Sequence, residues 1–266
     1  MPTAPVLRWA VSAAVLVGVA LLGWLVATTL APRADGAPAA ASAQVTAAAG
    51  DVTATPAASP SETPTPTATP TPTPSVPDAD AVAGVTGSVV PPALSGELVV
   101  VPGSEPAPGS GRVVRVRVEV EQGLPVEGGA FAAFVMATLN DARSWGADGT
   151  VTFARTDGDA DIRVLVASPA TVDRLCAPLR TNSRWSCGRY GHAALNAERW
   201  VHGSDAFNAA SGGDLLAYRQ YVVNHEVGHL LGHQHVGCPG AGQVAPVMLQ
   251  QSITLDGCVP NGWPHP

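Results

Sequence analysis

Histidine is concentrated in one short segment of this chain. Four of its seven histidines fall between His225 and His235, in the pattern H-E-x-x-H-x-x-G-x-x-H. The residues before the pattern, 215–224, read as a helix that runs into it. Because positions i and i+4 lie on one face of a helix, His225 and His229 can both point at a single ion. The segment therefore predicts a helix and a metal site at the same place, which constrains the fold more than any other feature.

Two histidines compete to be the third ligand. On a straight helix, at 1.5 Å per residue, His233 would lie about 12 Å along the axis from His225, whereas zinc ligands lie only about 2.0–2.1 Å from the ion. Gly232 resolves this, because glycine can take a positive φ, end the helix and turn the chain back. We expect His235 to be the third ligand and His233 to face solvent or support a ligand. A ligand role for His233 is the alternative.

Glu226 follows the first histidine and lies beside the ligand face. Its carboxylate can take a proton from a zinc-bound water, so we expect it to act as a general base. Three protein ligands leave one position of a zinc ion free for that water. The competing interpretation is a solvated helix end rich in histidine. It does not explain why a glycine and a further histidine follow at these offsets.

Met248 lies downstream, within the segment Ala245-Pro246-Val247-Met248-Leu249-Gln250-Gln251. This segment resembles the Met-turn of the metzincin metalloproteases, a tight turn whose methionine packs beneath the zinc ligands. The alternative is an ordinary core methionine, which fills gaps well. Gln250 stands two residues after Met248, so the tyrosine ligand of some metzincin branches is absent at that position.

The chain before residue 93 differs in composition from the rest. Residues 9–30 carry no charge and are almost wholly apolar, about the length that spans a bilayer. We expect a single-pass signal-anchor there, with residues 1–8 in the cytoplasm; a cleaved secretory signal, which would release the protein, is the alternative. Residues 31–92 are rich in Ala, Pro and Thr and are expected to form a disordered linker. The folded domain is expected over 93–266, outside the membrane, where it can associate with the cell wall.

All four cysteines lie in the C-terminal part of the chain. An even number in an exported domain indicates disulfides. Local pairing, Cys176–Cys187 and Cys238–Cys258, is the simplest of the three connectivities. A second metal site is the alternative, but the spacings lack paired C-x-x-C knuckles. The sequence shows no basic patch, so nucleic acid is not an expected partner.

Periodicity predicts a mixed α+β domain. Alternation of apolar and charged residues predicts a half-exposed strand over 112–121. Further strands are predicted over 151–155, 162–167 and 193–201, and helices over 131–144, from Pro169, and into the histidine pattern. An extended peptide substrate could add to the edge of the strand at 162–167.

Taken together, these residues resemble an actinobacterial family called domain of unknown function 3152, which is metzincin-like. The resemblance covers roughly Leu98 to Pro266. The segments that carry it are Val118-Glu119-Val120-Glu121, Gly123-Leu124-Pro125, Asp141-Ala142-Arg143-Ser144-Trp145-Gly146, Tyr218-Arg219-Gln220-Tyr221 running into the histidine pattern, Pro246-Val247-Met248 with Gln250-Gln251, and Gly257-Cys258.

The resemblance implies both a fold and an activity. The fold would be a metzincin-like mixed sheet with packing helices and a zinc-binding active-site helix followed by a Met-turn. The activity would be that of a zinc-dependent peptidase, with the ligand roles on His225, His229 and His235 and the base role on Glu226. The resemblance implies no particular substrate.

Two functions of different classes fit the sequence. The favoured one is a membrane-anchored endopeptidase that acts outside the membrane on protein or peptide substrates. The alternative is a non-catalytic, zinc-stabilised binding module at the cell surface, which suits the anchor and linker equally well. Such a closed site would fill all four zinc positions, with His233 as the obvious fourth ligand, and it would have no need of Glu226.

Overall fold

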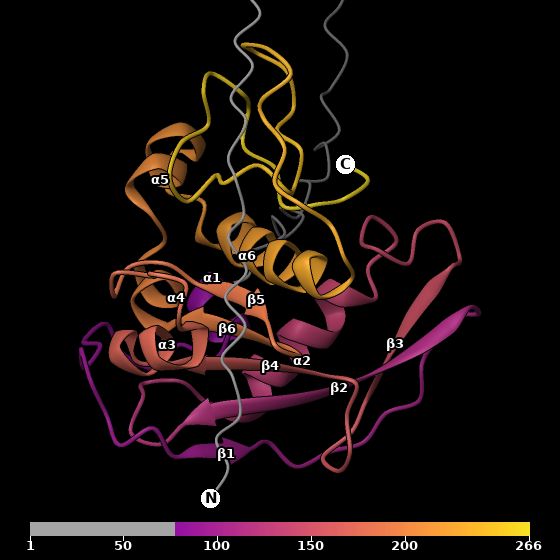
Figure 1. Ribbon diagram of the computed structural model, residues 1–266, viewed down its shortest axis with the longest axis vertical. Coiled ribbons are helices and arrows are strands. Elements are labelled where there is room, and N and C mark those ends of the chain that lie inside the picture. Colours follow the sequence, from indigo (N-terminus) through magenta and orange to yellow (C-terminus); the bar gives the residue numbers. More distant parts are fainter. Residues whose placement is uncertain (1–77) are drawn as a thin grey trace, which may run out of the picture. The chain divides into compact units, whose positions relative to one another are not determined.

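The computed structural model describes residues 78–266 (Figure 1). Its helices are α1 (Ala79–Val82), α2 (Gly128–Leu139), α3 (Pro169–Cys176), α4 (Ala197–His202), α5 (Asp205–Ser211) and α6 (Leu215–Leu230), and its strands are β1 (Leu98–Val100), β2 (Arg112–Glu121), β3 (Val151–Arg155), β4 (Ile162–Ala167), β5 (Cys187–Arg189) and β6 (His192–Asn196). The expected cytoplasmic residues, the anchor at 9–30 and most of the linker lie outside the described residues. Within 78–266, no helix is both long and apolar enough to cross a membrane.

The strands form one mixed sheet in the order β1-β2-β4-β6-β5, and β3 also pairs with β2. The long strand β2 pairs in parallel with β3 along its first half and with β4 along its second half. Strands β4 and β6 are also parallel, whereas β1 and β5 are antiparallel strands at the two edges. The domain is therefore α+β, as the sequence predicts.

The valines that alternate along β2 face the main core of the domain. Val114, Val116, Val118 and Val120 are buried in the main core, which also contains residues of α2 and α6. The opposite face carries α3, which packs a smaller apolar cluster against β4, β5 and β6. In Figure 1, α6 lies between the sheet and the C-terminal loops, which are drawn in yellow. Helix α6 therefore packs on the sheet on one side and on irregular loops on the other.

Three predicted strands have the bounds that the sequence indicates, namely β2, β3 and β4. The helix expected over 131–144 instead spans Gly128–Leu139. It begins earlier because the Glu127 carboxylate accepts hydrogen bonds from the amides of Gly129 and Ala130, which caps the helix. It ends at Asn140, whose side chain exchanges hydrogen bonds with the backbone of Phe153 in β3.

The strand expected over 193–201 is wrong in its second half. Strand β6 ends at Asn196, and α4 begins at the next residue. The Asn196 side chain accepts a hydrogen bond from the Glu198 amide at 3.0 Å, so it caps α4 and stops the strand. The apolar residues Trp200 and Val201 are buried, but they belong to helix α4 and not to a strand.

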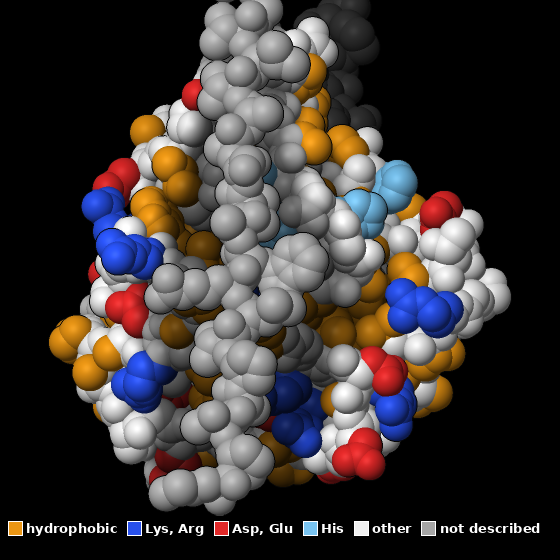
Figure 2. Space-filling model, viewed as in Figure 1, with side chains coloured by type: hydrophobic (Ala, Val, Ile, Leu, Met, Phe, Trp, Pro, Cys, Tyr) orange, Lys and Arg blue, Asp and Glu red, His pale blue; other side chains and the backbone are white. Residues whose placement is uncertain are grey.

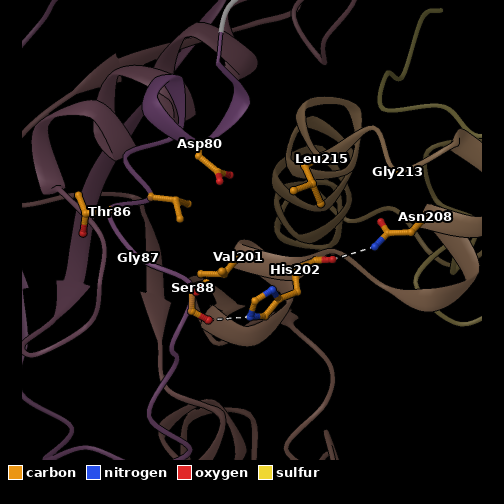
Figure 3. Close-up of a pocket in the computed structure, with 10 residues that line it drawn as sticks. Asp80, Thr86, Gly87, Ser88, Val201, His202, Asn208, Gly213 and Leu215 are labelled. Atoms are coloured by element: carbon orange, nitrogen blue, oxygen red, sulfur yellow. Dashed lines mark hydrogen bonds between the residues drawn. The ribbon is translucent and has the colours of Figure 1, made fainter.

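Residues 78–92, which the sequence assigns to the linker, pack against the domain. Val85 forms an isolated bridge with Val126, and the buried Trp200 donates from Nε1 to the Ala83 carbonyl at 3.2 Å. Figure 3 shows this segment facing α4, where His202 Nε2 lies 2.9 Å from the Ser88 carbonyl. The described domain thus begins upstream of residue 93.

Candidate metal centre

Helix α6 carries the first part of the histidine pattern. It starts after Asp214, whose side chain accepts a hydrogen bond from the Ala217 amide at 2.9 Å, and it continues to Leu230. Gly232 follows with φ +100°, a conformation that L side chains rarely adopt. The chain turns at this glycine as the sequence predicts, and the residues after it return towards the helix.

Three histidines come together as a result of this turn. The ligand atoms of His225, His229 and His235 all lie within 4.8 Å of one another. The Nε2 atoms of His229 and His235 are 3.0 Å apart. Three imidazole nitrogens this close can share one cation, and imidazole is a ligand that zinc accepts.

Backbone carbonyls orient two of these rings. Nδ1 of His225 lies 2.8 Å from the Val247 carbonyl, and Nδ1 of His229 lies 3.0 Å from the His233 carbonyl. A carbonyl oxygen only accepts, so each Nδ1 carries a proton, and in a neutral ring the Nε2 then keeps a free lone pair. Second hydrogen bonds of this kind fix the ring orientation and tautomer of metal-binding histidines. The donor set therefore fits a cation of the kind that the sequence indicates.

Burial favours the neutral form of two of these imidazoles. It lowers the pKa of His225 to about 3, and it also lowers the pKa of His235, which lies near His229. A protonated imidazole cannot bind a metal ion, because both of its nitrogens are then donors. His225 is therefore in its ligand form at neutral pH.

His233 does not join the group. Its ring stacks on Trp145, with the ring centroids 4.2 Å apart and the planes 21° from parallel. Trp145 is held in place by a 2.9 Å hydrogen bond from its Nε1 to the Asn224 carbonyl on α6. His233 contributes its carbonyl to His229 and places its ring against Trp145.

Glu226 lies next to the ligands and is buried, with 6% of its surface exposed. Burial raises the pKa of its carboxyl to about 8, and a backbone hydrogen bond from Gly188 opposes the shift. A cation held by the histidines would also oppose it, because a nearby positive charge favours the carboxylate. A carboxyl group whose pKa lies near neutrality can both take up and release a proton.

Two glycines let other parts of the domain approach α6 at this level. A Cβ on Gly188 of β5 would lie 2.0 Å from the Glu226 carbonyl oxygen. A Cβ on Gly228 would lie 2.5 Å from Trp145 Cζ2 and 2.6 Å from Met248 Sδ. Met248 therefore packs directly on the helix turn between His225 and His229.

The segment that contains Met248 is tied to α6. The Val247 carbonyl faces His225, and the Leu249 carbonyl accepts a hydrogen bond from the Tyr221 hydroxyl at 3.1 Å. The Leu249 amide donates back to the Pro246 carbonyl at 2.9 Å, which closes a tight turn around Met248. The turn thus orients the His225 ring, and its methionine packs on α6 at Gly228.

The three histidines and Glu226 line a cleft of about 650 Å³. Histidine side chains, pale blue in Figure 2, reach the surface on the face shown. One wall is formed by residues 179–181 and by 185–189, which includes β5, and the other contains Gln250, Ser252 and Ile253. The strand at 162–167 was the expected edge for a peptide, but β4 lies in the middle of the sheet, and β5 is the edge strand at the cleft.

Both predicted disulfides, Cys176–Cys187 and Cys238–Cys258, are present, and no cysteine is free. The first joins the end of α3 to the start of β5, so it fixes one cleft wall. The second joins the chain just after His235 to the chain beyond Met248. Each disulfide therefore holds one side of the site.

Comparison with known families agrees with the extent of the fold. The family described as Protein of unknown function (DUF3152) matches residues 85–266. The chain belongs to this family. The DUF3152 domain thus includes the sheet, α6 and all of the candidate ligands. No curated protein and no solved structure matches the chain.

Some residues of the site are brought there by the fold from distant parts of the chain. Trp145 and Gly188 touch the ligand helix from segments far away in the chain, and Arg180 and Arg189 line the cleft. Trp145 was noted only within a segment of the family resemblance. The other three carried no local signal, because their roles depend on which segments meet at α6.

Proposed function

We propose that this domain is a zinc-dependent endopeptidase of the metzincin type. The observation that carries the proposal is the convergence of three imidazoles, two of them with carbonyl-bonded Nδ1 atoms, beside a buried glutamate in an open cleft. Zinc bound there would polarise the scissile carbonyl and lower the pKa of a water molecule. Glu226 would accept a proton from the attacking water and deliver it to the leaving amine. Met248 serves as the methionine of a Met-turn beneath the ligands.

The substrate in this proposal is an extended peptide on the free edge of β5. An edge strand offers unpaired amide and carbonyl groups to which a peptide can add as a further strand. Gly188 of β5 lies against Glu226, so a peptide on this edge passes the base and the ligands. The edge is short, with the three residues Cys187–Arg189. The cleft therefore takes only a few substrate residues in extended form.

The proposed setting is outside the cell membrane. Two disulfides support an oxidising compartment, because such bonds are rare in the cytosol. The apolar segment at 9–30 would anchor the chain, and the Ala-, Pro- and Thr-rich segment would hold the domain away from the membrane. A secreted form follows if the segment at 9–30 is cleaved.

Replacing Glu226 by Gln tests the catalytic part of the proposal. The variant keeps the shape of the side chain and leaves the three ligands in place, so zinc content should be unchanged. Peptide cleavage should fall by at least about a hundredfold, as loss of a general base does. The measurement is cleavage of a peptide library by the full chain and by the variant, with zinc quantified in both. Full activity in the variant would exclude Glu226 as the base.

Replacing His233 by Ala separates the enzyme from a closed, structural zinc site. Because the His233 ring stacks on Trp145 and lies apart from the ligand group, His233→Ala should keep zinc. His235→Ala removes a proposed ligand and should weaken zinc binding by at least about tenfold. The measurement is a zinc titration against a competing chelator. Equal zinc loss in the two variants would favour the non-catalytic, zinc-stabilised binding module.

A further inference from the structure

One wall of the cleft carries positive charge, in addition to the three histidines and Glu226 of the proposed active site. Among residues 78–266, Glu226 is the only acid that lines the cleft, whereas Arg180 and Arg189 both belong to the wall that contains β5. Within the described residues, the arginines that lie within ion-pair distance of an acid are elsewhere: Arg115, Arg117, Arg143, Arg155, Arg163 and Arg219. The two guanidinium groups of the wall therefore keep a positive charge that no neighbouring carboxylate balances in this part of the chain.

Neutral groups hold Arg189 in position. Its Nη1 donates to the Cys176 carbonyl at 3.1 Å, and its Nη2 donates to the Tyr190 hydroxyl at 2.6 Å. Its Nε is buried and has no hydrogen-bond partner among the residues that the structure describes. A guanidinium fixed by neutral acceptors keeps donors for a planar anion such as a carboxylate.

The backbone next to Arg189 is in an unfavourable conformation. Tyr190 and Gly191 connect β5 to β6 with φ values of 51° and 75°, where a hairpin prefers Asn, Asp or Gly at both positions. Tyr190 is 65% exposed, so burial in the core does not explain a tyrosine there. Its ring instead lies under the Arg189 guanidinium, with 4.1 Å between Cζ and the ring centroid. Strained residues of this kind concentrate at binding sites.

Arg180 supplies the second charge without such support. It is exposed in the loop between α3 and β5, four residues after Cys176. The loop is anchored through Asp173, which accepts hydrogen bonds from the Ser183 amide at 2.8 Å and from the Thr181 hydroxyl. The Arg180 side chain thus extends from an ordered loop on the same side of the cleft as Arg189.

We propose that the cleft selects peptides with acidic side chains next to the bond that is cleaved, and that Arg180 and Arg189 bind those carboxylates. This inference rests on the proposed peptidase function and names its substrate class. Arg189 follows Gly188, the residue that lies against Glu226, so the selected side chain belongs within about two residues of the scissile bond. Arginine pairs well with carboxylates because its planar donors match their geometry.

Matched peptides test the inference on the zinc-loaded full chain. Each peptide pair carries either Glu or Gln at one position, from three residues before the bond to three after it. We expect kcat/KM to be at least about fivefold higher for Glu at one or two of these positions. The ratio should fall towards one in 1 M salt, where the Debye length is only about 3 Å. It should also fall to within about twofold in the Arg180→Gln/Arg189→Gln variant.

Arg174→Gln is the matched control. Arg174 is an exposed arginine on α3 that contacts Thr171 and does not line the cleft. The variant loses the same charge and should keep the full preference for Glu. A loss of preference equal to that of the cleft variant would show a general charge effect and would overturn the assignment to Arg180 and Arg189.

Binding to the Glu226→Gln variant separates failure of the inference from failure of the proposed function. Cleavage without any preference for Glu overturns the inference and leaves the peptidase. No cleavage, together with tighter binding of Glu peptides than of Gln peptides, overturns the peptidase and leaves the anionic site. Equal binding and no cleavage overturn both. Inorganic polyphosphate is added as a competitor at the same concentration of negative charge as the acidic peptide. If it competes equally well, the wall binds polyanions in general, and the assignment to peptides is overturned.

Discussion

Gly188 has no side chain, and this allows the cleft wall that contains β5 to lie against α6. A Cβ at Gly188 would lie 2.0 Å from the Glu226 carbonyl oxygen. The φ of Gly188 is outside the left-handed region, so the requirement is for space and not for backbone freedom. The clashing atom belongs to the backbone of a helix, which cannot move aside as a flexible side chain can. Gly188 therefore sets the distance between the cleft wall and the proposed base.

Replacing Gly188 by Ala should lower the free energy of unfolding by about 2–3 kcal/mol, because the added methyl group overpacks a buried contact. Chemical denaturation monitored by tryptophan fluorescence measures the change. Gly237→Ala is the matched control, since a Cβ at Gly237 meets nothing within 4 Å, and its effect should stay within about 0.5 kcal/mol. Equal stabilities for the two variants would show that β5 can move away from α6 at no cost.

The C-terminal loops depend on one helix for their order. Residues 231–266 contain no helix or strand of their own, and side chains of α6 bind their backbone. Tyr221 donates to Leu249, Nδ1 of His225 faces Val247, and Asn224 donates to Gly262 at 2.8 Å. The helix thus holds the loop whose Val247 carbonyl in turn orients the His225 ring. The Cys238–Cys258 disulfide closes this loop.

Removing the Cys238–Cys258 disulfide should weaken zinc binding by about tenfold, because the loop that orients His225 and follows His235 becomes less ordered. The double alanine variant should also lose roughly 2–4 kcal/mol of stability. The double alanine variant of Cys176 and Cys187 is the control. It should lose a similar stability and keep its zinc affinity. Titration against a competing chelator measures the zinc affinity of both variants. Equal affinities would contradict the proposal that the loop closed by Cys238–Cys258 orders the zinc site.

The described domain includes a segment that comes before its sheet. Arg219 of α6 is fully buried, and it donates to the Ala79 carbonyl at 2.6 Å, to Asp80 Oδ1 at 2.6 Å and to the Trp200 carbonyl at 2.8 Å. Two of these three partners belong to α1. A buried guanidinium that loses its partners is costly, because its charge is then neither hydrated nor paired. The N-terminal segment therefore stabilises α6, the helix that carries His225 and His229.

A chain that starts at residue 93 should be less stable than one that starts at residue 78, by at least about 3 kcal/mol, because Arg219 loses its carboxylate and a carbonyl. Urea unfolding of the two chains measures the difference. Arg219→Met in both chains is the control, since it removes the buried charge and should reduce the difference between them. Equal stability of the unsubstituted chains would place the start of the domain at residue 93, where the sequence analysis puts it.

Local patterns were enough to predict much of the fold. The strands at 112–121, 151–155 and 162–167 follow from short-range alternation, which depends only on which side chains must leave water. The disulfide pairing follows from short loops, which are the easiest to close. The approach of His235 to His225 and His229 follows from the rise of a helix and the conformational freedom of Gly232. Each of these features is decided within about twenty residues of chain, so the sequence alone determined it.

The tertiary structure decided the features that depend on distant neighbours. Alternation does not say where a strand lies in a sheet, so the edge strand at the cleft is β5 and not β4. Residues 78–92 join the domain because the buried Arg219 of α6 donates hydrogen bonds to oxygens of Ala79 and Asp80. Arg180 and Arg189 carry no local signal of their common wall. The physical reason is the same in each case: burial, charge balance and close approach depend on segments that meet only after the chain has folded.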